Sequence, residues 1–226
     1  MGAHTLLVIE NHYLGSVLKG NQFDTFYHEH PRTYSYTSFL HIAKSLLVDV
    51  LDIEFPSRYG GNIRVFMGSQ NTKSKVDFKL DRENLLKQES YFYDDFFNLK
   101  NVIAQWKLKK KDEITSEFLR HGKMLAKAFP GRAAILIKLL ELDENQILAV
   151  YEKPGSMKIG HYVPGTRIPI VSDDELKNND KHRVILNMAW HIKKEIKNYL
   201  AEFGFETVID VFDSKDFYQK DNYVEF

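Results

Sequence analysis

The stretch Lys123–Leu142, KMLAKAFPGRAAILIKLLEL, joins a short apolar run to a second apolar run through the turn Phe129-Pro130-Gly131-Arg132. A strand that leads through such a turn into a helix is the repeating unit of a layered α/β fold. The alternation continues to the C-terminal region, and we expect strand, helix, strand, helix, strand, helix, strand over residues 123–129, 133–142, 146–152, 173–178, 183–189, 192–203 and 206–212. The sequence therefore predicts a parallel α/β sheet after Gly122.

The turn at Phe129–Arg132 is a candidate phosphate site. Backbone N–H groups and the dipole at the start of the following helix favour an anion, and Arg132 would add a bidentate donor. A plain turn between strand and helix explains the same residues. The later segment 158–170, which begins with Lys158, is either a lid over this turn or a rigid connector rich in Pro and Gly.

The segments before the turn predict a smaller sheet. The continuous apolar run Thr5–Glu10 indicates a strand buried on both faces of a parallel sheet. Alternating residues in 51–55 and 63–67 predict two antiparallel strands. Between them we expect a short helix over Leu14–Lys19 closed by Gly20, and a helix to about Leu47 capped by Ser35 or Thr37.

A long helix is expected over residues 83–120. Its apolar positions are spaced four, three, four and three and predict a packed stripe: Phe92, Phe96, Leu99, Ile103 and Trp106. The basic run Lys107, Lys109, Lys110 and Lys111 is expected on the solvated side of this helix.

Composition excludes several classes of function. The 226 residues include 31 Lys+Arg, 31 Asp+Glu and no cysteine. Zero formal charge gives no reason to expect nucleic-acid binding, and thiolate sites and disulfides are excluded. No apolar window is long enough for a membrane span, and Met1–His4 lacks the features of a signal peptide, so we expect a cytoplasmic chain.

The densest polar cluster is Phe23–Pro31, FDTFYHEHP. In an extended segment Tyr27 and Glu29 project to one side, and His28 and His30 to the other. The two histidines could be metal ligands, although no third ligand stands at a recognisable spacing. Alternatively, a histidine base with a nearby carboxylate and phenol fits proton abstraction next to a carbonyl. A loop whose polar groups satisfy one another is the third interpretation.

A second cluster lies at the junction of the antiparallel strands. Gly60 and Gly61 permit a close approach of backbone to a ligand, while Tyr59, Asn62 and Arg64 could bind hydroxyls or phosphate. A tight turn explains the two glycines equally well.

In this order the motifs resemble the sugar C-methyltransferases that act on nucleotide-linked ketosugars. The resemblance covers nearly the whole chain. It is carried by residues 7–10 with Tyr13-Leu14-Gly15, by residues 22–30, by residues 59–65, and by residues 160–170 with Ala189-Trp190. The Tyr-x-Glu-His and Pro-Gly-Thr-x-Ile-Pro-Ile elements are fairly specific together.

The resemblance implies a catalytic triplet of Tyr27, Glu29 and His30. His30 would remove the proton next to the ketone, and Tyr27 and Glu29 would orient the substrate or steady the enolate. Together with the residue chemistry above, it leads us to expect substrate binding by Tyr59, Gly60, Gly61, Asn62, Arg64, Arg132 and Lys158. Tyr59 stands where the family has His, and Arg132 where it has Lys.

The resemblance also implies the domain organisation. Residues 1–72 would be the C-terminal part of a class I methyltransferase domain, 73–121 a helical connector, and 122–226 a Rossmann-like domain. The strand at 5–10 and the hairpin would be strands five to seven of one sheet. The expected chain therefore lacks the zinc domain and the residues that hold S-adenosylmethionine tightly.

We expect the chain to be a portion of an S-adenosylmethionine-dependent methyltransferase for a nucleotide-linked ketosugar. The alternative is a non-catalytic nucleotide-sugar binding or assembly module. Because the strand at 5–10 would have an open edge, we also expect self-association or a partner chain that supplies further strands.

Overall fold

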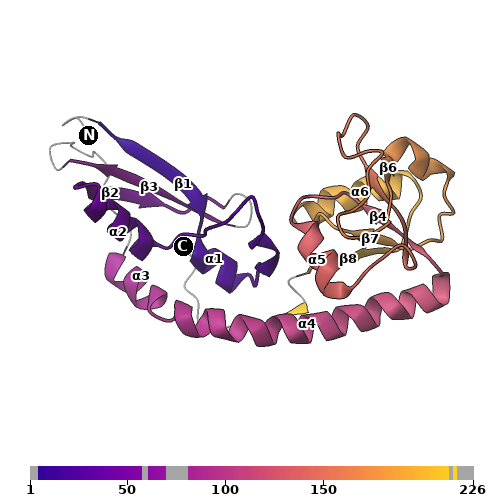
Figure 1. The fold of residues 1–226 in the computed structure, drawn as a ribbon, viewed down its shortest axis with the longest axis horizontal. Helices are drawn as coiled ribbons and strands as arrows, with labels where there is room; N and C mark the ends of the chain where they lie inside the picture. Colours follow the sequence, from indigo (N-terminus) through magenta and orange to yellow (C-terminus); the bar gives the residue numbers. More distant parts are fainter. Residues whose placement is uncertain (1–4, 58–60, 70–80, 214–215, 218–226) are drawn as a thin grey trace. The chain divides into compact units, whose positions relative to one another are not determined.

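The computed structural model describes residues 5–57, 61–69, 81–213 and 216–217 (Figure 1). Contacts divide these residues into two compact units. The first contains the described residues up to Thr25 and those from His30 to Asn101, and the second contains Phe26–Glu29 and the described residues from Val102 to Phe217. Each unit is built around its own sheet.

The first unit has a three-stranded antiparallel sheet in the order β1-β3-β2. Its strands are β1 (Leu7–His12), β2 (Asp49–Glu54) and β3 (Asn62–Gly68). The expected hairpin is confirmed, and so is its place in one sheet with the first strand. The expectation of a parallel, doubly buried first strand is wrong, because β1 runs antiparallel to β3 and Leu6 and Val8 are 48% and 46% exposed. An antiparallel edge strand needs only one covered face, and an apolar run does not distinguish the two cases.

One face of this sheet forms the core of the first unit. Ile63, Val65 and Met67 on β3 are fully buried, and α2 (Tyr36–Ser45) packs against β2 and β3. The predicted cap is confirmed: the Ser35 side chain accepts from the Ser38 N–H in a capping box. The helix α1 (Leu14–Lys19) and its closing Gly20 are also as expected, and a 3-10 turn, η1 (Phe23–Thr25), follows.

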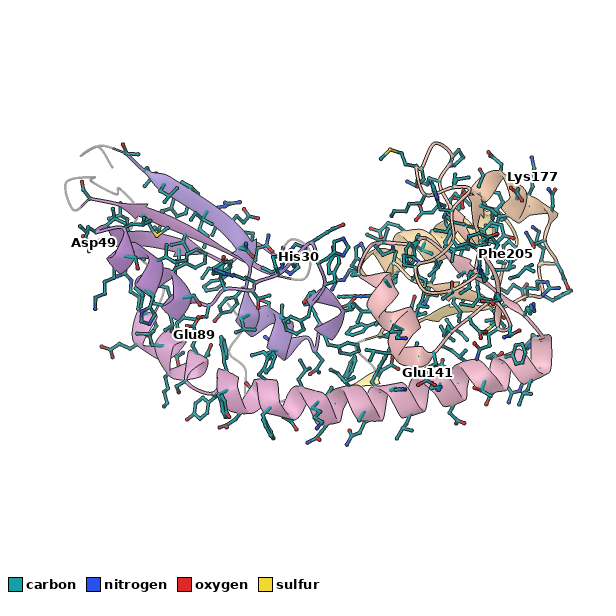
Figure 2. The ribbon with its side chains drawn as sticks, viewed as in Figure 1. His30, Asp49, Glu89, Glu141, Lys177 and Phe205 are labelled. Atoms are coloured by element: carbon teal, nitrogen blue, oxygen red, sulfur yellow. The ribbon has the colours of Figure 1, made fainter. Side chains whose placement is uncertain are left out.

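A buried carboxylate ties α2 to the rest of the unit. Glu89 ends α3 (Arg82–Glu89), where its side chain accepts the backbone N–H groups of Tyr36 at 2.6 Å and Thr37 at 2.8 Å (Figure 2). The Tyr13 hydroxyl donates to the same carboxylate at 3.1 Å. A negative charge at a helix N-terminus is favourable, and here it also satisfies N–H groups that have no partner within the helix.

Replacing Glu89 by Ala is expected to destabilise the first unit by about 3 kcal/mol, because buried donors lose a charged acceptor. Urea unfolding measures the loss, and amide exchange at Tyr36 and Thr37 should accelerate. Glu83→Ala in the exposed first turn of α3 is the control and should cost less than about 1 kcal/mol. Equal effects of the two changes would show that the Glu89 contacts contribute little.

The expected long helix is two helices. After α3, Ser90 and Tyr91 form a turn, and α4 (Phe92–His121) then runs without a break for 30 residues. Phe92, Leu99 and Trp106 of the predicted stripe are buried and Ile103 is half-buried, but Phe96 is 53% exposed. The prediction that the basic run is solvated is wrong for Lys110. This side chain is buried, and it binds Glu113, Asp216 and the Asp210 carbonyl.

The second unit has a five-stranded parallel sheet in the order β6-β5-β4-β7-β8. Its strands are β4 (Met124–Lys127), β5 (Ile147–Glu152), β6 (Ile170–Ser172), β7 (Ile185–Asn187) and β8 (Val208–Asp210). The helical elements are α5 (Ala133–Leu140), η3 (Asp173–Asn178), η4 (Trp190–Ile192) and α6 (Lys193–Glu202). The predicted parallel α/β fold is therefore confirmed. The sequence reasoning missed β6, which begins at the last residue of the loop-rich segment 158–170.

A buried ion pair holds the carboxyl ends of β4 and β6 together. Lys127 ends β4 and its amine binds Asp173, the residue that follows β6, while the Tyr199 hydroxyl of α6 donates to the same carboxylate at 3.0 Å. Both charged side chains are only 3% exposed. Burial, helped by the bond to Asp173, raises the pKa of Tyr199 to about 12.

Glu141 closes α5 in the left-handed conformation and binds two lysines of α4, Lys107 at 2.7 Å and Lys111 at 2.6 Å. The two ammonium groups lower the pKa of this exposed carboxylate from 4.5 to about 2.

A carboxylate with a lowered pKa stabilises the fold above its ordinary pKa and loses that contribution as the pH falls through the folded-state value. Wild type should therefore exceed Glu141→Gln in stability near neutrality, and the difference should disappear between about pH 4.5 and 2. Urea midpoints across that range measure it. A difference independent of pH would contradict the charge assignment.

Candidate functional site

The Tyr-x-Glu pair of the polar cluster is joined by a hydrogen bond. The Tyr27 hydroxyl donates to Glu29 Oε2 at 2.7 Å. The segment is a bend and turn rather than the extended strand expected, so this turn, and not strand alternation, brings the two side chains together. Tyr27 is half-buried, whereas Glu29 and the intervening His28 are exposed. Glu29 therefore fixes the direction of the phenol and remains accessible to a ligand.

The pair lies against the turn between β4 and α5. A Cβ built on Gly131 would lie 3.0 Å from the Tyr27 ring and 3.3 Å from Glu29 Oε1. Such distances are shorter than ordinary Cβ contacts, so glycine makes room for this approach. Two motifs that are about 100 residues apart in the sequence thus meet within the second unit.

Glu152 and Lys158 complete the surroundings of the turn. The Phe129 N–H donates to Glu152 Oε1 at 2.6 Å, and the Lys158 amine donates to the Phe129 carbonyl at 2.6 Å. Lys158 is also 4.0 Å from Glu152. The loop that follows β5 therefore contacts the predicted phosphate turn, where one backbone donor is already bound to a carboxylate.

Arg132 is held by an aromatic side chain. It is buried, and its guanidinium lies 4.8 Å from the centre of the Trp190 ring, which itself stacks on Phe212 at 4.7 Å. Trp190 follows β7, so this contact joins the segments after β4 and β7. Stacking on the indole ring fixes the orientation of the guanidinium plane.

The strand order places these residues where ligands bind in open α/β sheets. The chain leaves β4 toward β5 and β6 on one side and returns to β7 and β8 on the other. Ligands bind outside the carboxyl ends of the strands at such a switch point. Glu152 was missed by the sequence reasoning, although an acid at the end of the second strand, about 20 residues after the glycine turn, is a known signal.

His30 belongs to the first unit, where its ring lies 4.7 Å from that of His12 at the end of β1. The structure thus assigns Tyr27 and Glu29 to one unit and His30, the next residue in the chain, to the other. A single peptide bond joins Glu29 to His30, which limits their separation whatever the arrangement of the units.

A polar row crosses the second face of the first sheet. Arg64 binds Glu10 at 2.7 Å and Glu54 at 2.6 Å, and these residues are its register partners on β1 and β2. Asn62 donates to Glu10 at 2.8 Å, while its buried Oδ1 has no partner among the described residues. The two carboxylates offset the charge of Arg64, so this row favours hydroxyl groups over phosphate.

Gly61 has φ +111, and a Cβ there would lie 2.4 Å from Ser16 Oγ, so both conformation and space require glycine. Tyr59 and Gly60, which the sequence reasoning also singled out, lie outside the described residues.

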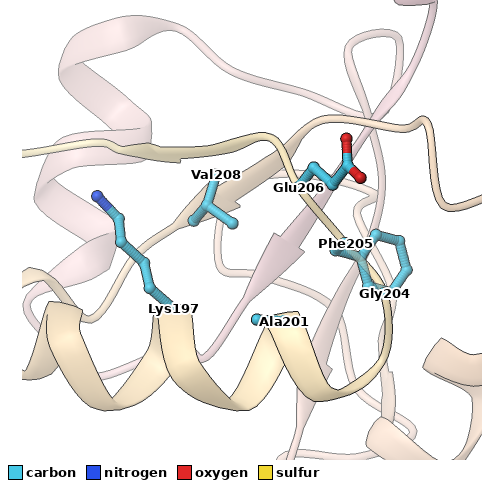
Figure 3. Close-up of a pocket in the computed structure, with 6 residues that line it drawn as sticks. All are labelled: Lys197, Ala201, Gly204, Phe205, Glu206 and Val208. Carbon is cyan, nitrogen blue, oxygen red and sulfur yellow. The ribbon is translucent and has the colours of Figure 1, made fainter.

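Among the described residues, no three or more His, Asp or Glu side chains are grouped to hold a metal ion. A surface pocket of about 460 Å³ lies at the end of α6 beside β8 (Figure 3) and contains none of the residues predicted from the sequence. Its lining residues are Lys197, Ala201, Gly204, Phe205, Glu206 and Val208. No described helix is long and apolar enough to cross a membrane.

The first unit does not fit S-adenosylmethionine. Such donors are held by a Gly-rich turn after a parallel strand and by an acid on the next strand. Here the described chain passes from β1 through Tyr13 directly into α1, and every strand pairing is antiparallel. The described residues of this unit therefore provide no donor site.

The second unit is thus a Rossmann-like α/β domain with its polar cluster at the switch point of the sheet. The chain belongs to the C-methyltransferase C-terminal domain family, whose model matches residues 57–209. It is also 28% identical over 206 residues to the C-methyltransferase NovU of Streptomyces niveus. The alignment covers 88% of this chain but 47% of the relative. The resemblance predicted from the motifs is confirmed at the level of the family.

Gly131→Val tests the approach of the Tyr-x-Glu pair to the turn. The larger side chain should displace Tyr27 and Glu29 while the parallel sheet remains folded, because both contacts are to side chains rather than to backbone. NMR shifts of Tyr27 and Glu29 should change far more than those of β5 and β7. Unchanged Tyr27 and Glu29 resonances would contradict the contact.

Proposed function

We propose that this chain is the part of an S-adenosylmethionine-dependent C-methyltransferase that binds the methyl acceptor, a nucleotide-linked ketosugar. The observation that supports it most is the Tyr27–Glu29 pair, which lies against the β4–α5 turn and is followed directly by His30. A phenol, a carboxylate and an imidazole in three of four consecutive positions are the groups that proton abstraction beside a ketone requires.

In this proposal His30 is the base. The imidazole takes the proton from the carbon next to the ketone, the electrons of the C–H bond pass into the enolate, and the carbon becomes nucleophilic toward a methyl donor. Tyr27 transfers its hydroxyl hydrogen bond from Glu29 to the developing oxyanion, and Glu29 then accepts a hydrogen bond from a sugar hydroxyl.

The nucleotide portion is assigned to the second unit. The β4–α5 turn with Arg132, Lys158 and Glu152 offers cationic and backbone donors for the diphosphate and a carboxylate for ribose hydroxyls. Glu152 would then exchange its bond to Phe129 for the ligand. The predicted roles of Tyr59, Gly60, Gly61, Asn62 and Arg64 concern hydroxyl recognition by the first unit.

The methyl donor requires strands that the described residues do not provide. We assign residues 1–72 to a methyltransferase domain, 73–121 to a connector and 122–226 to the acceptor domain. The outer edge of β1 pairs with no other described strand, and we propose that it receives a further strand, from a partner chain or from a second copy.

Hydrogen exchange at the sugar tests the base without a methyl donor. In D2O, the chain should catalyse deuterium incorporation next to the ketone of a dTDP-linked 4-ketosugar, detected by NMR. His30→Ala should slow exchange by about 100-fold or more. His28→Ala is the matched control, because His28 is an exposed histidine two positions away, and it should retain the wild-type rate.

Calorimetry separates the base assignment from the wider proposal. Wild type should bind dTDP-glucose and bind S-adenosylmethionine weakly or not at all. Binding of the nucleotide sugar without any deuterium exchange would favour the alternative, a non-catalytic nucleotide-sugar binding module. Absence of both would overturn the proposed function, and tight binding of S-adenosylmethionine would contradict our account of the donor site.

A further inference from the structure

The long helix α4 exposes an apolar stripe on the side opposite its packed face. Phe92, Leu99, Trp106 and Ile114 are buried on the inner side. On the outer side Tyr93, Phe97, Leu108 and Leu119 are 79%, 72%, 73% and 77% exposed, although all four are large apolar side chains. Exposed apolar residues that line up in this way mark an interaction surface.

The spacing of the stripe is regular. Tyr93 and Phe97 are followed eleven residues later by Ala104 and Leu108, and eleven residues later again by Thr115 and Leu119. Eleven residues complete almost three turns of an α-helix, so these six positions, which are all exposed and uncharged, stay on one side of α4.

The spacing of the stripe is the same in both directions along the helix. Its spacings are four, seven, four, seven and four, and they read the same from either end of the helix. If a second α4 is placed antiparallel with a two-fold axis at residue 106, Tyr93 faces Leu119, Phe97 faces Thr115 and Ala104 faces Leu108. Each large side chain then meets a smaller or aliphatic one, as in an isologous interface.

We propose that α4 is the interface between two copies of this chain, packed antiparallel through this stripe. The four large side chains expose roughly 500 Å² in each copy, so the pair buries about 1,000 Å², which is the size at which specific interfaces begin. This surface is independent of the β1 edge and of the predicted catalytic residues.

The first test is sedimentation velocity up to roughly 200 μM protein. Wild type should form dimers, and Leu108→Glu should weaken them at least about 30-fold, because each dimer then holds two charges against Ala104. Glutamate is a good helix former, so α4 should persist by circular dichroism. Asn98→Glu is the matched control and should dimerise normally, because Asn98 is exposed on the same helix but is three or four residues from none of the stripe positions.

The second test fixes the geometry and uses the absence of native cysteine. In Tyr93→Cys/Leu119→Cys the two thiols are about 39 Å apart within one helix and cannot react with each other. An antiparallel pair brings them together across the axis, so the double variant should give a covalent dimer under mild oxidation. Each single variant should not.

Three results would overturn the proposal. They are a wild-type monomer at every concentration, a Leu108→Glu dimer as strong as wild type, and cross-linking of Leu119→Cys alone at the rate of the double variant. The last would indicate a parallel pair. None of these outcomes depends on methyltransferase activity, so the proposed function stands or fails separately.

Discussion

The second unit depends on the parallel pairing of β4 with both of its neighbours. The strand has only four residues, Met124–Lys127, and all are buried. Since parallel strands end at the same edge of a sheet, the turn after β4, Glu152 at the end of β5 and the segment after β7 come to one place. The Lys127–Asp173 pair holds that edge, because an unpaired charge in this interior would be costly.

The first unit depends on a different kind of contact. Its antiparallel sheet is covered on one face by α2, whose N-terminus is fixed by the buried Glu89 carboxylate. The other face carries the row Glu54–Arg64–Glu10, and His12 contacts His30. One face of the sheet is thus packed in the core and the other carries polar side chains, as is common in antiparallel sheets.

The helix α4 combines two amphipathic patterns. The inner pattern packs on its own chain through Leu99, Trp106 and Ile114, while the outer one repeats every eleven residues. Helical periodicity predicted the first pattern and also placed the exposed Phe96 in it. Periodicity alone does not show which of the two stripes is buried, because apolar residues on either side of a helix recur about every 3.6 residues.

The sequence by itself determined the family, its motifs and the order of most of the elements. Alternating apolar runs predicted the parallel sheet after Gly122, and Ser35 predicted the start of α2, because these signals are local. Only the tertiary structure decided that β1 is antiparallel, that β6 exists, that Lys110 is buried and that Tyr27 and Glu29 lie against Gly131. Each of these outcomes depends on contacts between residues far apart in the chain, which local pattern does not encode.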